Sequence, residues 1–277
     1  MKQNNDGYMA NITLPGLVNP HDLSADRQFA MNLARGLEVL RAFTPGDAML
    51  GNREISDRTG LPKPTVSRLT YTLTLLGYLS RDTHFQKYRL GTGVLSLGYP
   101  LLANMQVRQS ARPLMEQLAR QTGCTVNLGM RDRGNVVYVD TVRVDDRNIH
   151  LPDIGSTRPL LASAIGRALI LACPTAERTA ILNYLKVHDK DLFEQHRAAW
   201  DADKKVFATH GFCHSRGDWQ TDVHAVAVPI RVLAREAPVA MNCTLSADKM
   251  PKEMLEREVV PQLMNAVRQL EAAHGLR

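Results

Sequence analysis

The chain has 277 residues, of which 44% are hydrophobic and 22% charged, and its formal net charge is +6. This composition is ordinary for a soluble globular protein, and no run of about 18 apolar residues is present to span a bilayer. The four cysteines lie far apart and form no CxxC pair, which argues against a disulfide framework and a structural zinc site. We therefore expect a cytoplasmic protein of two domains, without a metal or a cofactor.

The first segment, residues 1–26, is polar and lacks the continuous apolar stretch and cleavage site of a secretory signal. We expect it to be a flexible leader. A helix is predicted from Gln28 to Phe43, before the breaker sequence Thr44-Pro45-Gly46. Its apolar residues recur at helical spacing and should point inward: Phe29, Leu33, Leu37, Leu40 and Phe43.

Residues 52–79 have the pattern of two short helices joined by a tight turn. The first is predicted from Glu54 to Arg58 and ends at Gly60, because glycine readily takes the left-handed conformation of a helix end. The second begins at Pro64, and its apolar residues recur at steps of three and four, which predicts one buried stripe. That stripe consists of Val66, Leu69, Leu73 and Leu76.

The opposite face of this second helix carries short hydroxyls, a tyrosine and two cations. Such side chains supply donors that reach base edges and phosphates in a DNA major groove. A helix, a glycine turn and a helix form the helix-turn-helix pattern, although any small helical hairpin shares it. The predicted DNA-contacting residues of the helix are Lys63, Thr65, Ser67, Arg68, Tyr71 and Thr72.

A basic hairpin follows this helix. Two short strands, 78–82 and 87–91, flank a polar loop, and a basic hairpin directly after a recognition helix is typical of a wing. We expect His84, Gln86 and Lys87 to contact DNA as well. Residues 27–91 are therefore predicted to form a winged helix-turn-helix domain.

The positive charge of the chain is concentrated in the same region. Between Arg27 and Arg89, ten basic residues stand against five acidic ones, which leaves an excess of +5 (10 − 5). Phosphate groups are bound by local clusters of Lys and Arg, so this excess of positive charge favours a nucleic acid as partner.

A linker helix is predicted at 92–106, where apolar residues have helical spacing although Pro100 interrupts them. An apolar connector of this kind can serve as a dimer seam, and packing on its own domain is the alternative. Residues 107–277 alternate hairpins and helices, which predicts an α+β domain with a pocket. Its strands are expected at 125–130, 136–140, 224–229 and 238–245, and its helices at 112–121, 161–172, 175–185, 191–209 and 253–273.

Several segments, in this order, resemble the IclR family of bacterial transcriptional regulators. The winged helix contains GLPKPTVSRLTYTLTLLGYL, and the segments IGSTRPLLASAIGRALI, GFCHSRGDWQTDVHAVAVPI and PVAMNCTLS follow. The resemblance covers residues from about 27 to 272 and implies a GAF-like α/β effector-binding domain after the linker. It also implies a repressor or activator of a catabolic operon, which binds palindromic double-stranded operator DNA as a homodimer or a dimer of dimers. The implied effector is a small organic acid or an aromatic acid.

The resemblance also assigns effector-binding positions. The family's pocket includes a helix N-terminus, where unpaired N–H groups form an anion site for a carboxylate. On the matching strand, Asn242 and Thr244 face the same way because side chains alternate, and Arg216 could fork onto a carboxylate. The matched positions are Ser163, Ala164, Ile165, Ser215, Arg216, Trp219, Val223, Ala225, Asn242 and Thr244.

An enzyme is the rival class of protein, but the sequence contains no GxSxG elbow, no HExxH motif and no P-loop. His210 and His214 could share a helix face and bind a metal, but Gly211 interrupts the helix between them. Within the regulator class, an aliphatic acid of the glyoxylate or pyruvate type is the alternative effector. The loop Arg216-Gly217-Asp218-Trp219 resembles that of regulators of aromatic-acid breakdown, and this resemblance implies an aromatic acid.

Overall fold

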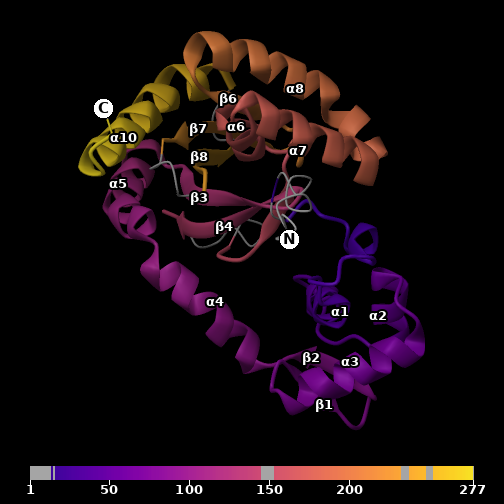
Figure 1. Cartoon of the computed structure of the whole chain (residues 1–277). Helices are drawn as coiled ribbons and strands as arrows, with labels where there is room; N and C mark the ends of the chain where they lie inside the picture. Colours follow the sequence, from indigo (N-terminus) through magenta and orange to yellow (C-terminus); the bar gives the residue numbers. More distant parts are fainter. Residues whose placement is uncertain (1–13, 15, 145–152, 232–236, 248–251, 277) are drawn as a thin grey trace, which may run out of the picture. The chain divides into compact units, whose positions relative to one another are not determined.

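Two hydrophobic cores organise the chain, each inside its own unit. The computed structural model describes residues 14, 16–144, 153–231, 237–247 and 252–276 (Figure 1). One unit is Val18–Met105, and the other comprises Met1–Leu17 with Gln106–Arg277. Most of the predicted leader, 1–13 and 15, lies outside the described residues, whereas Leu14 and Leu17 pack against the core of the second unit.

The unit Val18–Met105 is a winged helix-turn-helix followed by a helix, as predicted. The chain runs through a short 3-10 helix before α1, then through the paired helices α2 and α3 to the hairpin β1–β2, where Arg81 pairs with Tyr88. Gly60 ends α2 in the left-handed conformation at a φ of 70°, the role predicted for it. The bounds are 3-10 helix Pro20–Leu23, α1 Met31–Arg41, α2 Asn52–Thr59, α3 Lys63–Leu75, β1 Leu79–Asp82, β2 Lys87–Leu90 and α4 Thr92–Asn104.

The core of this unit corrects part of the predicted stripes. Val39, Ile55 and Val66 are completely buried at its centre. Leu33 and Leu37 of α1 were expected to point inward, but they are 65% and 49% exposed, because Val39 and Ala42 occupy the side of α1 that meets the other helices. Leu76, expected inside, is 63% exposed because it lies beyond the last turn of α3.

The second unit is built on an antiparallel six-stranded sheet of order β5-β4-β3-β8-β7-β6. Its central strands β3 and β8 pair from Thr125 opposite Thr244 to Met130 opposite Val239, with Asn127 opposite Asn242. The bounds are α5 Gln106–Thr122, β3 Thr125–Asp132, β4 Asn135–Val142, β5 Thr157–Pro159, α6 Ala164–Ala172, α7 Thr175–His188, α8 Lys190–His210, β6 Cys213–Arg216, β7 Val223–Ile230, β8 Val239–Ser246, α9 Lys252–Met254, a π-helix Leu255–Val259 and α10 Val260–Ala273.

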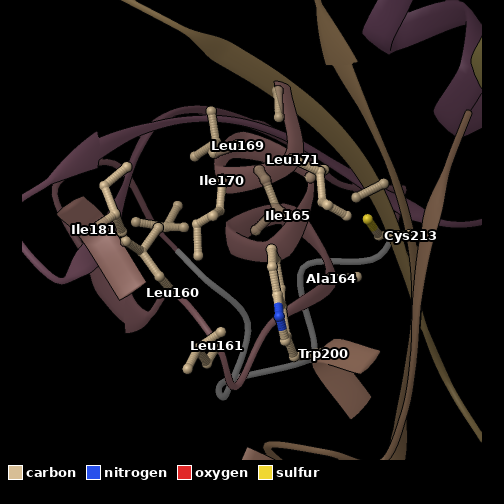
Figure 2. Packing of buried hydrophobic residues seen from close by; sticks show 14 of the residues in the cluster. Leu160, Leu161, Ala164, Ile165, Leu169, Ile170, Leu171, Ile181, Trp200 and Cys213 are labelled. Carbon is tan, nitrogen blue, oxygen red and sulfur yellow. The ribbon is translucent and has the colours of Figure 1, made fainter. Parts of the chain in front are cut away.

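Helices cover this sheet in two groups. Helices α5 and α10 pack on each other and on the central strands, while α6 packs on β7 and β8 and is itself covered by α7 and α8 (Figure 1). Figure 2 shows the resulting core, in which Ile165 and Ile170 of α6 lie near Trp200 of α8 and Cys213 of β6. Gly166 allows this packing, since a Cβ there would lie 2.2 Å from the carbonyl oxygen of Leu160.

Two strands of this unit were not predicted. Strands β5 and β6 have three and four residues, too short to show an alternating pattern. The helix predicted from Leu161 begins at Ala164 instead, because Ser163 caps it: its Oγ accepts a hydrogen bond from the Gly166 N–H at 3.2 Å. The segment predicted as one closing helix contains the π-helix near its start. Among the described residues, every helix is too short or too polar to cross a membrane.

Candidate nucleic-acid interface and effector pocket

The outer face of α3 is exposed along its length. Val66, Thr70 and Leu73 face the core, and the Thr70 hydroxyl is satisfied by donating to the Val66 carbonyl at 2.9 Å. Tyr71 is 66% exposed, although it is a large aromatic residue. Of the residues predicted to contact DNA, Thr65 is half-buried and the others are exposed: Lys63, Ser67, Arg68, Tyr71 and Thr72.

Some cations of this unit form ion pairs inside the unit, and others do not. Arg58 grips Asp47 through both terminal nitrogens, at 2.5 and 2.9 Å, and donates to the Ala42 carbonyl at 2.8 Å. The hydrogen bond from Arg58 holds the pKa of the Asp47 carboxyl far below its usual range. By contrast, Lys63 and Arg68 form no ion pair within the described residues. The cations available to phosphate are therefore fewer than the sequence count suggests.

The wing is ordered by its own side chains. The Asp82 carboxylate accepts hydrogen bonds from the N–H groups of His84 and Phe85, both at 3.0 Å. Gln86 has a positive φ of 52°, accepts a hydrogen bond from Arg81 and donates to the Thr83 carbonyl. The tip is therefore shaped before any DNA arrives, and the amide of Gln86 is already in use.

Lys87 links the wing to α2. Its Nζ lies 3.0 Å from the Glu54 carboxylate, and Glu54 also accepts a hydrogen bond from the Gly51 N–H at 2.7 Å. The bond from Gly51, with Lys87 second, lowers the pKa of Glu54. The charge of Lys87 is therefore partly balanced by Glu54. Lys63, which is also predicted to bind DNA, has no such partner among the described residues.

A cavity of about 50 Å³ lies between α6 and the sheet of the second unit. All predicted effector-binding residues except Ile165 and Arg216 line it, although they come from widely separated segments. The pairing of Ala225 with Thr244 and with Ser215 brings three strands to the same place. The complete lining is Tyr138, Arg158, Ala162, Ser163, Ala164, Ser215, Trp219, Gln220, Val223, Ala225, Asn242 and Thr244.

The start of α6 forms one end of the cavity. Ser163 and Ala164 line it directly. The first intrahelical bond runs from the Arg167 N–H to the Ser163 carbonyl, and the Ser163 hydroxyl caps Gly166. The N–H groups of Ala164 and Ile165 precede that first bond, so this end of the helix keeps donors for a ligand.

Ile165 and Arg216 are placed elsewhere. The side chain of Ile165 is completely buried in the core beneath α6, so only its backbone stays near the cavity (Figure 2). Arg216 was expected on a loop, but it lies on β6, where alternation turns Ser215 inward and Arg216 outward. Its Nη2 lies 2.7 Å from Glu256 Oε1 instead.

Four lining residues were not predicted: Tyr138, Arg158, Ala162 and Gln220. The Arg158 guanidinium lies 5.8 Å from the centroid of the Trp219 ring. Burial raises the pKa of Tyr138 to about 12, so its phenol stays protonated at neutral pH. The only available sequence signal was that Arg158 lies a few residues before the predicted helix.

Hydrogen bonds fix the polar wall of the cavity. Asn242 is 2% exposed, and its Oδ1 accepts a hydrogen bond from Asn127 Nδ2 at 3.0 Å. Asn127 Oδ1 in turn accepts from the Thr141 hydroxyl at 2.7 Å. The side chain of Asn242 is therefore oriented by two neighbouring strands.

A buried arginine fixes the loop that carries Trp219. Arg167 is completely buried, and its donors bond Asp203 Oδ2 and Asp218 Oδ2, each at 2.6 Å. It also donates to the carbonyls of Leu161 and His214 at 2.7 Å. Because Arg167 belongs to α6, the pocket helix and the Trp219 loop are held by one guanidinium.

His210 and His214, the pair considered as metal ligands in the sequence, lie on different elements. Helix α8 ends at His210, and Gly211 takes the left-handed conformation at a φ of 76°. His214 lies on β6 with its Nδ1 3.0 Å from Asp203 Oδ1. In the described part of the chain, no group of three His, Cys, Asp or Glu residues is arranged to hold a metal ion.

Family models match both units. The model of the bacterial transcriptional regulator IclR C-terminal domain matches residues 100–272, and that of the IclR helix-turn-helix domain matches residues 32–83. The chain belongs to the IclR family. This family consists of DNA-binding transcriptional regulators, and the fold predicted from its resemblance is confirmed.

Individual members of the IclR family match over most of their length. The chain is 32% identical over 243 residues to the HTH-type transcriptional regulator TsaQ1/TsaQ2 of Comamonas testosteroni, covering 87% of each protein. It is 24% identical over 270 residues to the p-hydroxybenzoate hydroxylase transcriptional activator of Acinetobacter baylyi, covering 92% of this chain and 96% of that one. A crystal structure of an IclR family regulator from Brucella abortus has 43% identity and a TM-score of 0.83, with 90% and 94% covered.

Proposed function

We propose that this member of the IclR family is an effector-responsive regulator of a catabolic operon, acting in the cytoplasm. Helix α3 and the wing bind a palindromic operator, and a small organic acid binds the cavity beside α6. The observation that carries the proposal is that this one cavity gathers eight of the ten predicted effector positions, from α6, the strands and the Trp219 loop.

The surface of α3 supports the DNA-binding part of the proposal. Lys63 and Arg68 are exposed and form no ion pair within the described residues, so both charges are available for phosphate or base contacts. Arg68 can bond guanine through two donors, whereas Lys63 acts as a point charge near the backbone. His84 and Gln86 stand at the exposed tip of the wing.

The chemistry of the cavity supports an acid as effector. Its lining, as far as the structure describes the chain, contains an arginine and no carboxylate, and it includes the start of α6 with the N–H groups of Ala164 and Ile165. Trp219 and Tyr138 add aromatic surface, which favours an aromatic over an aliphatic acid. The Acinetobacter relative is named for control of an enzyme of p-hydroxybenzoate, an aromatic acid.

The surface of α4 supports a homodimer or a dimer of dimers. This helix has no buried residue, and four of its apolar side chains are at least 61% exposed: Leu95, Leu97, Tyr99 and Leu101. Leu33 and Leu37 of α1 add apolar surface in the same unit. Exposed apolar surface of this extent on a helix is typical of a subunit interface.

The test uses the purified full-length protein. An operator is selected from a random pool of duplexes, and its binding is titrated with and without aromatic and aliphatic carboxylates. We expect at least one carboxylate to change operator affinity and to raise the melting temperature of the protein. A selected sequence without palindromic symmetry, or the absence of any response to carboxylates, would contradict the proposal.

A further inference from the structure

The cavity contains one formal charge that the protein itself does not balance. Arg158 is half-buried in its lining, and among the described residues no Asp or Glu lines the cavity with it. Its Nη1 donates to the carbonyl of the adjacent Thr157 at 2.9 Å, and within the described part of the chain it forms no salt bridge. A guanidinium has five N–H donors, so most of its fork remains available.

The two other arginines near the cavity are already paired. Arg167 is completely buried between Asp203 and Asp218, and Arg216 bonds Glu256. Each would have to break an existing ion pair before it could bind an anionic ligand. The cation with free donors in the cavity wall is therefore Arg158.

The Arg158 guanidinium lies next to the ring of Trp219. The guanidinium lies 5.8 Å from the ring centroid, within the range of a cation–π contact. The ring itself is carried next to Asp218, whose carboxylate is held by Arg167. The two side chains therefore present a cation beside a flat apolar surface, and one ligand can meet both.

The cavity is so small that Trp219 and Arg158 must move when a ligand enters. A volume of about 50 Å³ is well below that of ordinary small-molecule sites. Trp219 is 45% exposed, so its ring can move outward without disturbing the core. Entry of a ring-sized ligand therefore displaces the Trp219 side chain, and Arg158 can follow it onto the ligand.

We propose that Arg158 is the specificity-determining residue of this pocket, and that it pairs the carboxylate of an aromatic acid whose ring packs on Trp219. The proposal rests on the effector-binding function proposed above and names its ligand class. Arg158 supplies a bidentate ion pair, Trp219 supplies the aromatic surface, and the start of α6 can donate to the same ligand. An aliphatic acid of equal charge would gain the ion pair without the ring contact.

The experiment measures ligand binding by isothermal titration calorimetry with the full-length protein. Benzoate and its three monohydroxy derivatives are titrated first. The tightest of them is then compared with its amide, which keeps the shape without the charge, and with its cyclohexane analogue, which keeps the charge without the aromatic ring. The variants are Arg158→Gln, Trp219→Leu and, as a matched control outside the cavity, Arg216→Gln.

We expect Arg158→Gln to weaken binding of the acid by about tenfold or more, the usual value of a hydrogen bond to a charged group. Arg216→Gln should leave it unchanged, and the amide should bind wild type and Arg158→Gln alike. The cyclohexane analogue should bind wild type more weakly than the aromatic acid, and Trp219→Leu should remove that difference. Arg158→Lys, which keeps the charge but loses the fork, should give an intermediate loss even if Arg158→Gln fails to fold.

Different failures have different meanings. Equal affinity of the acid for wild type and Arg158→Gln would overturn the role of Arg158 while leaving the pocket as an effector site. Equal affinity of the aromatic acid and its cyclohexane analogue for wild type would overturn the ligand class. If none of the aromatic acids binds at millimolar concentration, the ligand class named here is overturned. The effector function proposed above is decided separately, by the operator titration that includes aliphatic carboxylates.

Discussion

The α3 surface and the proposed effector pocket beside α6 are built in opposite ways. Lys63, Ser67 and Arg68 stand in solvent and have few bonds to the rest of the chain. In the pocket, Asn242 is almost completely buried and bonded, and the loop carrying Trp219 is held by the ion pair of Asp218 with Arg167. The comparison teaches that substitutions on α3 should change binding without changing stability, whereas most substitutions around the pocket change both.

The largest loss of stability is expected for a substitution of Arg167, which lies between the pocket and the core. Arg167→Met removes the charge that Asp203 and Asp218 share and leaves both carboxylates without their cation, while Asp203 retains its bonds to His214. The loss of one partner from a buried ion pair costs about 3–5 kcal/mol. The denaturant midpoint of the C-terminal unit, followed by its circular dichroism, measures this loss. Asp218→Asn is the control, because the remaining bond to Asp203 should preserve much of the stability; equal losses in both variants would contradict this assignment.

On the α3 side, Arg68→Ala should weaken binding to the selected operator by about 1–3 kcal/mol and relax the base preference at one position. Its melting temperature should match that of wild type, because the exposed side chain forms no ion pair within the described residues. Gel-shift titrations against single-base operator variants measure the first effect. If affinity and base preference are both unchanged, Arg68 does not read the sequence.

Asn242→Leu tests whether pocket residues can be changed without a cost in stability. It leaves Asn127 Nδ2 without its acceptor in a buried position, so we expect a destabilisation of about 1–3 kcal/mol together with loss of the effector response. Thr244→Val is the control variant and should destabilise the protein less, since the Thr244 hydroxyl donates only a long hydrogen bond of 3.4 Å to the Thr125 carbonyl. A similar unfolding midpoint for both variants would mean that the Asn127–Asn242 bond contributes little.

The smallest effect concerns two lysines that look alike in sequence. Lys63→Ala should reduce the salt dependence of binding to a non-specific duplex by about 0.9 in the logarithmic slope if Lys63 neutralises one phosphate. Lys87→Ala should reduce it less, because Lys87 is already 3.0 Å from Glu54. Affinities measured over a range of salt concentrations give both slopes. Equal changes would show that the Glu54 pair opens when DNA binds.

The DNA-binding unit could be predicted almost completely from its sequence. The features that define it are local in sequence: Gly60 shapes the turn, Val66 and Leu73 face inward, and the wing closes across a loop of four residues between Asp82 and Lys87. Where the prediction was wrong, at Leu33, Leu37 and Leu76, the residues are apolar but exposed. Periodicity identifies an apolar stripe, but it does not say whether this chain or another surface covers it.

The sequence by itself determined the class of protein, the order of the two domains and most of the pocket positions, because helical periodicity, strand alternation and the family motifs are properties of short segments. The tertiary structure alone decided which cation belongs to the pocket. Arg216 was the candidate by sequence, yet the alternation of β6 turns it outward to Glu256, and the short strand β5 brings Arg158 to Trp219 instead. The pairing of distant charges depends on how the sheet and its loops assemble, and no local pattern records that.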